Sequence, residues 1–252
     1  LEETDCFFFF GQNPGTNAPR FLHPLKAAKD RGARIVTFNP VREQGLISFV
    51  DPQNLFDMAT GTATTISDQY HQLKAGSDIA AILGLCKVVI EADDAAARDG
   101  RPAVIDHAFI AEHTHGFDAF IAFAREVPWA RITAECGLAE ADIRAAGEVY
   151  ISAERVIGVY GMGLTQQADG ATNIGMLVNL LLLRGNIGRP GAGCCPVRGH
   201  SNVQGQRTVG IAEKVALVPV EKLRALFGFD PPMKDGMHVV DAAEAIVEGR
   251  LK

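Results

Sequence analysis

The stretch that decides the fold is DCFFFFGQNPGTNAPRFLHPLKAAKDRGARIVTF, residues 5–38. It opens with a short apolar run containing four consecutive phenylalanines, which predicts a strand buried on both faces. A turn follows over residues 11–17, and residues 20–31 then place apolar side chains at helical spacing before Gly32. Residues 33–38 predict a second buried strand. Strand, turn, helix and strand in this order form a βαβ unit, which implies a parallel sheet.

The rest of the chain continues the alternation of strands and helices. Two further strands are expected, at residues 68–74 and 155–160. A helix is expected to begin at Asp78 with Ser77 as its N-cap, and residues 94–101 to form an exposed linker. The other expected helices cover residues 106–113, 117–126, 139–152 and 171–184, the last of them buried on all sides. The expected fold class is therefore α/β, a three-layer αβα Rossmann-like domain with a mainly parallel sheet.

Composition excludes several classes of protein. The 252 residues are 47% hydrophobic, which is enough for a sizeable core. The formal charge of −6 argues against nucleic acid as a partner, because nucleic-acid binding needs a basic surface. We find no run of 18 or more apolar residues, so no transmembrane helix is expected.

The five cysteines predict no metal cluster within this chain. They are scattered and form no Cys-x-x-Cys pair, which is typical of reduced thiols in a cytoplasmic protein. Adjacent Cys194 and Cys195 are either a ligand pair or, as we favour, small residues in a tight loop. The sequence starts without Met or a signal-peptide pattern, so we expect a fragment whose original targeting signal is lost.

Residues 185–210 are rich in glycine, with seven in 26 positions. Glycine lets a backbone approach a ligand closely. The segment also carries side chains that donate hydrogen bonds, including Arg189, Arg198, His200 and Asn202. We interpret it as backbone wrapped around a large, oxygen-rich, anionic ligand; the alternative is an ordinary long surface loop.

Four shorter motifs follow the expected strands, where ligands bind in open α/β sheets. Each also has a plain structural interpretation, as a turn or a helix cap. The first is followed by a helix whose N-terminus would suit a phosphate. In chain order, the motifs supply the candidate binding residues Gly11, Asn13 and Asn17; Asn39 and Arg42; Gly76 and Asp78; and Gly161, Met162 and Gln166.

These motifs together resemble the molybdopterin oxidoreductases, and in particular the branch similar to formate dehydrogenase alpha subunits. The resemblance runs from about residue 5 to residue 210 and rests on GQNPGTN, NPVR, GSD, GMGLTQ, GNIGRPGAG and PVRGHSNVQG. It implies the formate dehydrogenase/DMSO reductase type of domain. It also implies that the ten candidate residues contact a molybdopterin guanine dinucleotide, with Asp78 on the guanine edge and Asn39 near the ribose.

The resemblance places Arg198 and His200 beside the metal and the substrate as candidate catalytic residues. A planar, always charged guanidinium suits a small anion such as a carboxylate. The family's formate dehydrogenases have Gln where this chain has His200, which adds a titratable group and weakens the case for formate. No metal-ligating residue is predicted within the chain; His107, His113 and His115 are interpreted as surface or core residues rather than a metal site.

The predicted organisation is a molybdopterin guanine dinucleotide-binding α/β domain over residues 1–210 and a segment of a neighbouring domain, or a docking tail, over residues 211–252. The resemblance implies an oxidoreductase that uses molybdenum or tungsten, a small-molecule substrate and an electron-transfer partner. It also implies a possible 4Fe-4S cluster elsewhere in the whole enzyme, and an inactive isolated fragment. Two alternatives stay open: an NAD-dependent dehydrogenase domain and a non-catalytic nucleotide-binding domain. Two features count against the dehydrogenase. Gln166 stands where the dinucleotide-binding fingerprint Gly-x-Gly-x-x-Gly has its third glycine, and position 39 holds Asn where such domains have an acid.

Overall fold

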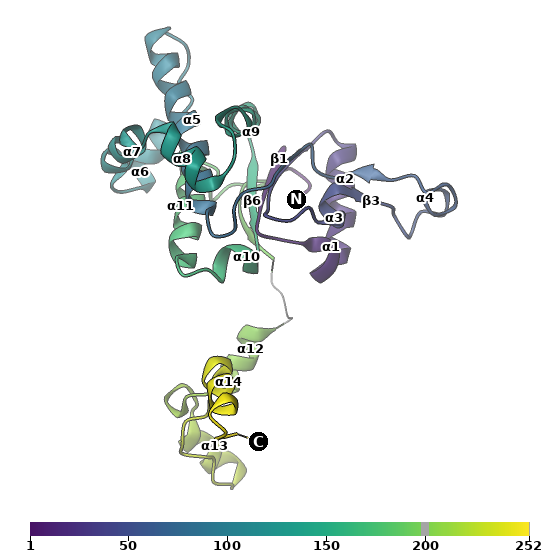
Figure 1. Ribbon diagram of the computed structural model, residues 1–252, viewed down its shortest axis with the longest axis vertical. Coiled ribbons are helices and arrows are strands. Elements are labelled where there is room, and N and C mark those ends of the chain that lie inside the picture. The colour runs from purple at the N-terminus through teal and green to yellow at the C-terminus, as the bar shows by residue number, and fades with distance from the viewer. Residues whose placement is uncertain (198–201, 252) are drawn as a thin grey trace. The chain divides into compact units, whose positions relative to one another are not determined.

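A computed structural model describes residues 1–197 and 202–251 (Figure 1). The chain divides into two compact units, residues 1–199 and residues 200–252. The predicted boundary at residue 210 falls inside the second unit and stays a prediction about the whole protein.

The first unit is built on a five-stranded sheet with the strand order β5-β2-β1-β6-β7. Every neighbouring pair in this sheet is parallel, which confirms the predicted fold class. The central strand β1 pairs with β2 on one side and with β6 on the other. The strands are β1 (Cys6–Phe10), β2 (Arg34–Phe38), β5 (Gln69–His71), β6 (Val156–Tyr160) and β7 (Gly193–Pro196).

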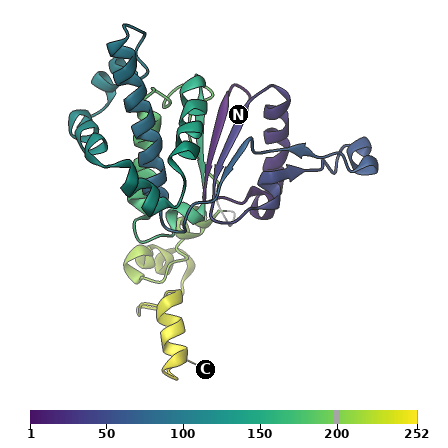
Figure 2. The ribbon, with the colours of Figure 1, turned by 45° about the horizontal axis from the view of Figure 1, so that its top comes forward.

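The run of phenylalanines fills both faces of the sheet. Phe8 and Phe10 pack in a core cluster with residues of α5 (Asp78–Arg98), α9 (Glu140–Ser152) and α11 (Gly170–Leu182). Phe7 and Phe9 pack in a separate cluster with residues of α2 (Leu22–Asp30). Helices therefore cover both faces, as Figure 2 shows, and the three-layer arrangement follows from a strand that is apolar on both sides.

The remaining elements connect these layers. The helices α6 (His107–His113), α7 (Phe117–Glu126) and α8 (Trp129–Cys136) lie between α5 and α9 in the chain. Between β2 and β5 in the chain, a two-stranded hairpin of β3 (Ser48–Phe49) and β4 (Thr64–Thr65) carries α4 (Leu55–Thr60). Short helical turns complete the unit: α1 (Pro14–Asn17), a 3-10 turn (Pro19–Phe21), α3 (Gln44–Ile47) and α10 (Met162–Thr165).

Three sequence-based expectations were wrong. Residues 94–98 are not a linker but the last turn of α5, because the Ala95–Ala97 run is strongly helix-forming and Ala96 is buried. The glycine-rich segment is not all loop, since residues 193–196 form β7, which places Cys194 and Cys195 in a strand. Helix α11 is buried through Leu177, Leu180 and Leu181 but exposes Ala171 and Gly175, so only one of its sides is covered.

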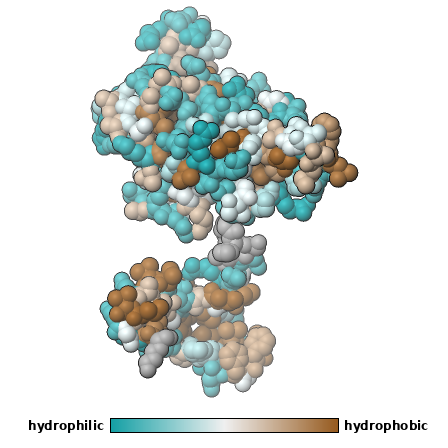
Figure 3. All heavy atoms as spheres, turned by 45° about the vertical axis from the view of Figure 1, so that its right-hand side comes forward, coloured by the Kyte–Doolittle hydropathy of each residue, from teal (hydrophilic) through white to brown (hydrophobic). Residues whose placement is uncertain are grey.

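The second unit contains α12 (Val203–Thr208), a 3-10 turn (Val215–Leu217), α13 (Val220–Phe227) and α14 (Val239–Val247). Large apolar side chains such as Phe227, Val239 and Val247 are exposed on this unit, and apolar surface is visible over it in Figure 3. Ala245 is the one residue of α14 that is buried.

Candidate cofactor-binding site

The predicted binding motifs lie at one edge of the sheet. Gly11 directly follows β1, Asn39 follows β2, Gly161 follows β6, and the motif containing Asp78 comes a few residues after β5. The strands are parallel, so their carboxyl ends share this edge. The chain passes from β1 to β2 and β5 on one side, and β6 and β7 lie on the other. The carboxyl ends of β1 and β6 therefore flank the topological switch point, where sheets of this kind bind ligands.

At the switch point, the loops after β1 and β6 are in direct contact. The backbone N–H of Gly163 donates to the carbonyl oxygen of Gly11 at 3.0 Å. A Cβ on Gly11 would lie 2.7 Å from the backbone carbon of Gly163, and a Cβ on Gly161 would overlap the side chain of Gln12. These glycines are therefore needed for the contact between the two loops, in addition to any role in binding a ligand.

Asn13 and Asn17 organise the loop after β1. The Oδ1 of Asn13 accepts from the backbone N–H of Thr16 at 3.2 Å, and its Nδ2 donates to Oε2 of Glu43 at 2.7 Å. The Oδ1 of Asn17 accepts from Nε2 of Gln12 at 3.0 Å. The helix expected after this loop is α2, which begins at residue 22, after α1 and a 3-10 turn. The phosphate contact at its N-terminus stays a prediction.

Asn39 and Arg42 belong to the loop after β2. The Nδ2 of Asn39 donates to the carbonyl oxygen of Val41 at 2.7 Å, and Asn39 is buried. The guanidinium of Arg42 lies 5.6 Å from the ring centroid of Tyr70, whose hydroxyl also donates to Val41. Asn39 thus shapes the loop, whereas Arg42 is an exposed cation held over an aromatic face.

Asp78 is the first residue of α5 and is only 2% exposed. Its Oδ2 accepts a hydrogen bond from Nε2 of Gln167 at 2.7 Å. Burial raises the pKa of the Asp78 carboxyl, and the bond from Gln167 acts in the opposite direction. Helix α5 begins at Asp78 with Ser77 at the N-cap position, as expected, but the Ser77 hydroxyl donates to the carbonyl oxygen of Lys74 and makes no capping bond to the helix. Gly76 has a φ of +83°, which favours glycine.

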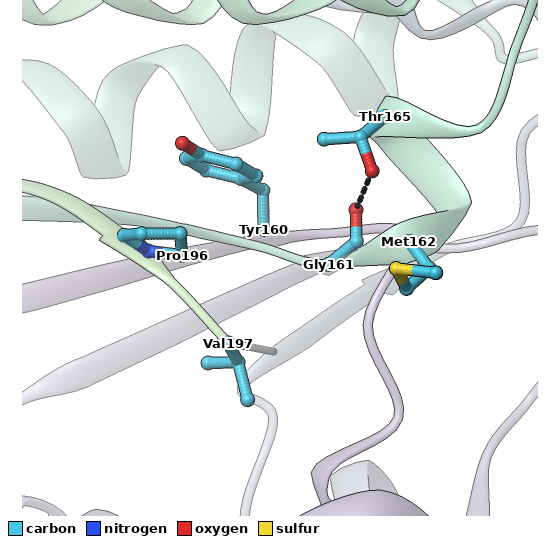
Figure 4. A pocket seen from close by; sticks show the side chains of 6 residues that line it. All are labelled: Tyr160, Gly161, Met162, Thr165, Pro196 and Val197. Carbon is cyan, nitrogen blue, oxygen red and sulfur yellow. Dashed lines mark hydrogen bonds between the residues drawn. The ribbon is translucent and has the colours of Figure 1, made fainter. Parts of the chain in front are cut away.

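A cavity of about 350 Å³ lies between the carboxyl ends of β6 and β7 (Figure 4). Met162 borders it and is 45% exposed, and Gln166, four residues on, is exposed as well. These two candidate residues are therefore accessible to a ligand. The cavity is lined by Tyr160, Gly161, Met162, Thr165, Pro196 and Val197.

The two candidate catalytic residues, Arg198 and His200, lie outside the described residues. The chain reaches them from β7, whose end is fixed by a hydrogen bond from the N–H of Val197 to the carbonyl oxygen of Tyr160 at 2.8 Å. Their roles stay predictions.

Within residues 1–197 and 202–251, no cluster of three or more His, Cys, Asp or Glu side chains could hold a metal ion. His107 instead pairs with Asp93, its Nε2 lying 2.8 Å from Oδ2 of the carboxylate. Burial raises the pKa of both the Cys194 and the Cys195 thiol, and all five cysteines are free. In the same part of the chain, no helix is long and apolar enough to cross a membrane.

The residues at this edge fit a nucleotide-containing ligand. Two glycine loops meet at the switch point, an exposed arginine can pair with phosphate, and a buried carboxylate can accept N–H groups from a base. Gln167 contacts Asp78 at this edge and was not predicted from the sequence, although it stands next to the candidate Gln166. A single polar residue in a loop carries no sequence signal of its own. The fold defines an α/β domain of the doubly wound type, with its candidate site at the switch point.

Comparison with known proteins identifies the family. The model of the molybdopterin oxidoreductase domain matches residues 1–231. The chain belongs to the molybdopterin oxidoreductase family. This confirms the resemblance on which the predicted binding residues were based.

Several relatives show how the chain compares with whole proteins. It is 43% identical over 252 residues to Protein YdeP of Escherichia coli (strain K12), covering 100% of this chain and 33% of that protein. It is 30% identical over 210 residues to formate dehydrogenase H of the same strain, covering 83% of this chain and 26% of that protein. Acetylene hydratase from Pelobacter acetylenicus shares the fold, with a TM-score of 0.57 and 20% identity over 72% of this chain and 21% of that chain. The chain therefore spans about a third, or less, of the length of these proteins.

Proposed function

We propose that this chain forms part of the binding site for a molybdopterin guanine dinucleotide in a larger oxidoreductase that uses molybdenum or tungsten. The observation that carries the proposal is the position of Asp78. It is a buried carboxylate at the carboxyl edge of the sheet, and it is hydrogen-bonded across to the loop after β6. A carboxylate in this position can accept two N–H groups from the edge of a guanine base.

Each neighbouring loop has a part in holding the dinucleotide. Arg42 is exposed and carries a charge that suits a phosphate. Met162 borders the cavity after β6 and can pack against the ligand, and the exposed Gln166 can hydrogen-bond to it. Asp78 is 2% exposed, so guanine reaches it only after a neighbouring side chain has shifted. When bound, the metal-pterin group supplies two-electron chemistry; these residues bind and orient it.

The proposed substrate is a small molecule, with an anion as the favoured class. Arg198 would hold the anion, and His200 would add a group that titrates near neutrality. Formate is not singled out, because the family's formate dehydrogenases have Gln at the position of His200. A cytoplasmic location, an electron-transfer partner and a 4Fe-4S cluster elsewhere in the whole protein complete the proposal.

Substitution of Asp78 tests the proposed guanine contact. In the full-length protein, Asp78→Ala should lower the amount of GMP-containing pterin released from purified protein on denaturation. Loss of a hydrogen bond to a charged group costs about 1.5–3 kcal/mol, or roughly 10- to 100-fold in affinity. The circular dichroism of the variant should match that of the wild type. An unchanged content of GMP-containing pterin in a folded variant would refute the assignment.

A further inference from the structure

A single glutamine in the loop after β6 connects three parts of the site. The Nε2 of Gln167 donates to Oδ2 of Asp78 at 2.7 Å and to the carbonyl oxygen of Gly163 at 2.6 Å. Its Oε1 accepts from Nδ2 of Asn173 at 2.9 Å. Asp78 and Gln167 are 89 residues apart in the chain, so this amide fastens the start of α5 to the loop that follows β6.

The glutamine is fixed at both ends of its amide. Asn173, in α11, is 1% exposed, and its Nδ2 also donates to the carbonyl oxygen of Leu164 at 3.2 Å. Gly163, the other acceptor, is bonded to Gly11 in the loop after β1. The side chain of Gln167 therefore has little freedom to turn away, and the carboxylate that it contacts is held in one orientation.

The bond also favours the charged form of the carboxylate. Burial favours the neutral acid, whereas an N–H donor stabilises the ionised form. An ionised carboxylate has about four acceptor positions on its two oxygens. Gln167 uses one of them, which leaves enough for the two N–H groups that a guanine edge presents.

We propose that Gln167 is a positioning residue that holds Asp78 for base recognition and thereby sets the preference for guanine. This inference rests on the proposed function and extends it to a residue that the binding motifs do not contain. Gln167 acts through Asp78. It contacts α5, α11 and the loop after β6, so its loss should weaken recognition of the base more than binding of the rest of a nucleotide.

The experiment compares GMP with IMP, which lacks the exocyclic amine but keeps the ring N–H. Dissociation constants are measured by ligand-observed NMR on the full-length protein prepared without cofactor. The wild type should prefer GMP by about tenfold or more, since one N–H bond to a carboxylate distinguishes the two nucleotides. Gln167→Met, similar in length but without the amide, should reduce this preference several-fold. Gln53→Met changes an exposed glutamine remote from the network and should leave the preference unchanged.

The double substitution shows whether Gln167 acts through Asp78. In an Asp78→Ala background, adding Gln167→Met should change neither dissociation constant further. Should Gln167→Met fail to fold, the same dissociation constants are measured for Gln167→Asn, whose shorter side chain cannot reach all three partners.

The outcomes separate the two proposals. If Asp78→Ala removes the preference for GMP but the Gln167 variants keep it, the inference about Gln167 is wrong and the proposed function stands. Tighter GMP binding by the variants would also overturn the inference, because it would show that Gln167 blocks the carboxylate. No GMP preference in the wild type, or the same preference after Asp78→Ala, would overturn the guanine assignment itself.

Discussion

Asp78 illustrates how the contacts of a candidate site residue depend on its surroundings as well as on its motif. The motif Gly76-Ser77-Asp78 indicates a helix cap or a base contact, and sequence alone does not decide between them. In the structure, the hydroxyl of Ser77 donates to a backbone carbonyl, and Asp78 is bonded to Gln167. The carboxylate is thus part of a network between loops, which a simple helix cap would not require.

Arg198 provides a separate test at the level of one side chain. An isolated buried guanidinium is costly unless it is paired, and Asp169 is the only acid in the sequence between Arg155 and Ile211. We expect a ligand or substrate anion as its partner. In the full-length, cofactor-loaded enzyme, Arg198→Ala should lower kcat/KM by on the order of 10²–10³, as removal of one well-placed electrostatic donor does.

Arg198→Lys should restore little of this loss, because a point charge does not reproduce the planar guanidinium fork. Cofactor content is measured alongside the kinetics. If both variants keep full cofactor content and near-wild-type kcat/KM, Arg198 does not belong to the active site.

At the residue scale, sequence could predict which loops carry polar side chains but not which partners they find. Asn13 was predicted as a binding residue, and its Nδ2 is bonded to Glu43, 30 residues away. Gln167 was missed because its contact with Asp78 spans 89 residues. Such contacts depend on how the loops meet at the sheet edge, and no local pattern encodes them.

At the scale of elements, α5 and α9 pack closely through small residues. A Cβ on Gly147 of α9 would lie 2.6 Å from a methyl carbon of Val88 in α5. Alanine forms helix better than glycine by about 1 kcal/mol, so propensity alone predicts that Gly147→Ala stabilises the chain. We expect the opposite, a loss of about 1–3 kcal/mol, because overpacking a core interface outweighs that gain.

Urea denaturation of the 252-residue chain measures the effect. Gly175→Ala is the matched control: Gly175 also lies in a helix, but a Cβ there meets nothing within 4 Å. The control should be neutral or stabilising by up to about 1 kcal/mol. A stabilising Gly147→Ala would show that α5 and α9 are less closely packed than described.

The elements with strong apolar patterns could be predicted, and the others could not. The run from Cys6 to Phe10 is apolar throughout and forms the central strand, fully buried as expected. In contrast, β7 consists of Gly, Cys, Cys and Pro, which carry no strand signal. It forms because β6 offers a parallel partner, and its proline is tolerated because β7 is an edge strand.

At the scale of the whole molecule, the chain represents about a third of its longer relatives. We predict that the isolated 252-residue chain has no redox turnover and no stoichiometric molybdenum, because we expect the metal ligand and the rest of the pterin site to lie elsewhere in the protein. Turnover is measured with an artificial electron acceptor after incubation with cofactor and metal, beside the full-length protein as a positive control. Activity of the chain alone would show that it holds a complete active site.

The most direct test of the central claim is the identity of the nucleotide bound by the full-length protein. The purified protein is denatured, and the released small molecules are identified by mass spectrometry. We predict a pterin joined to GMP, in an amount that approaches the amount of metal in the sample. Release of NAD, or of a pterin without a guanine nucleotide, would contradict the assignment of this sheet edge as a guanine dinucleotide site.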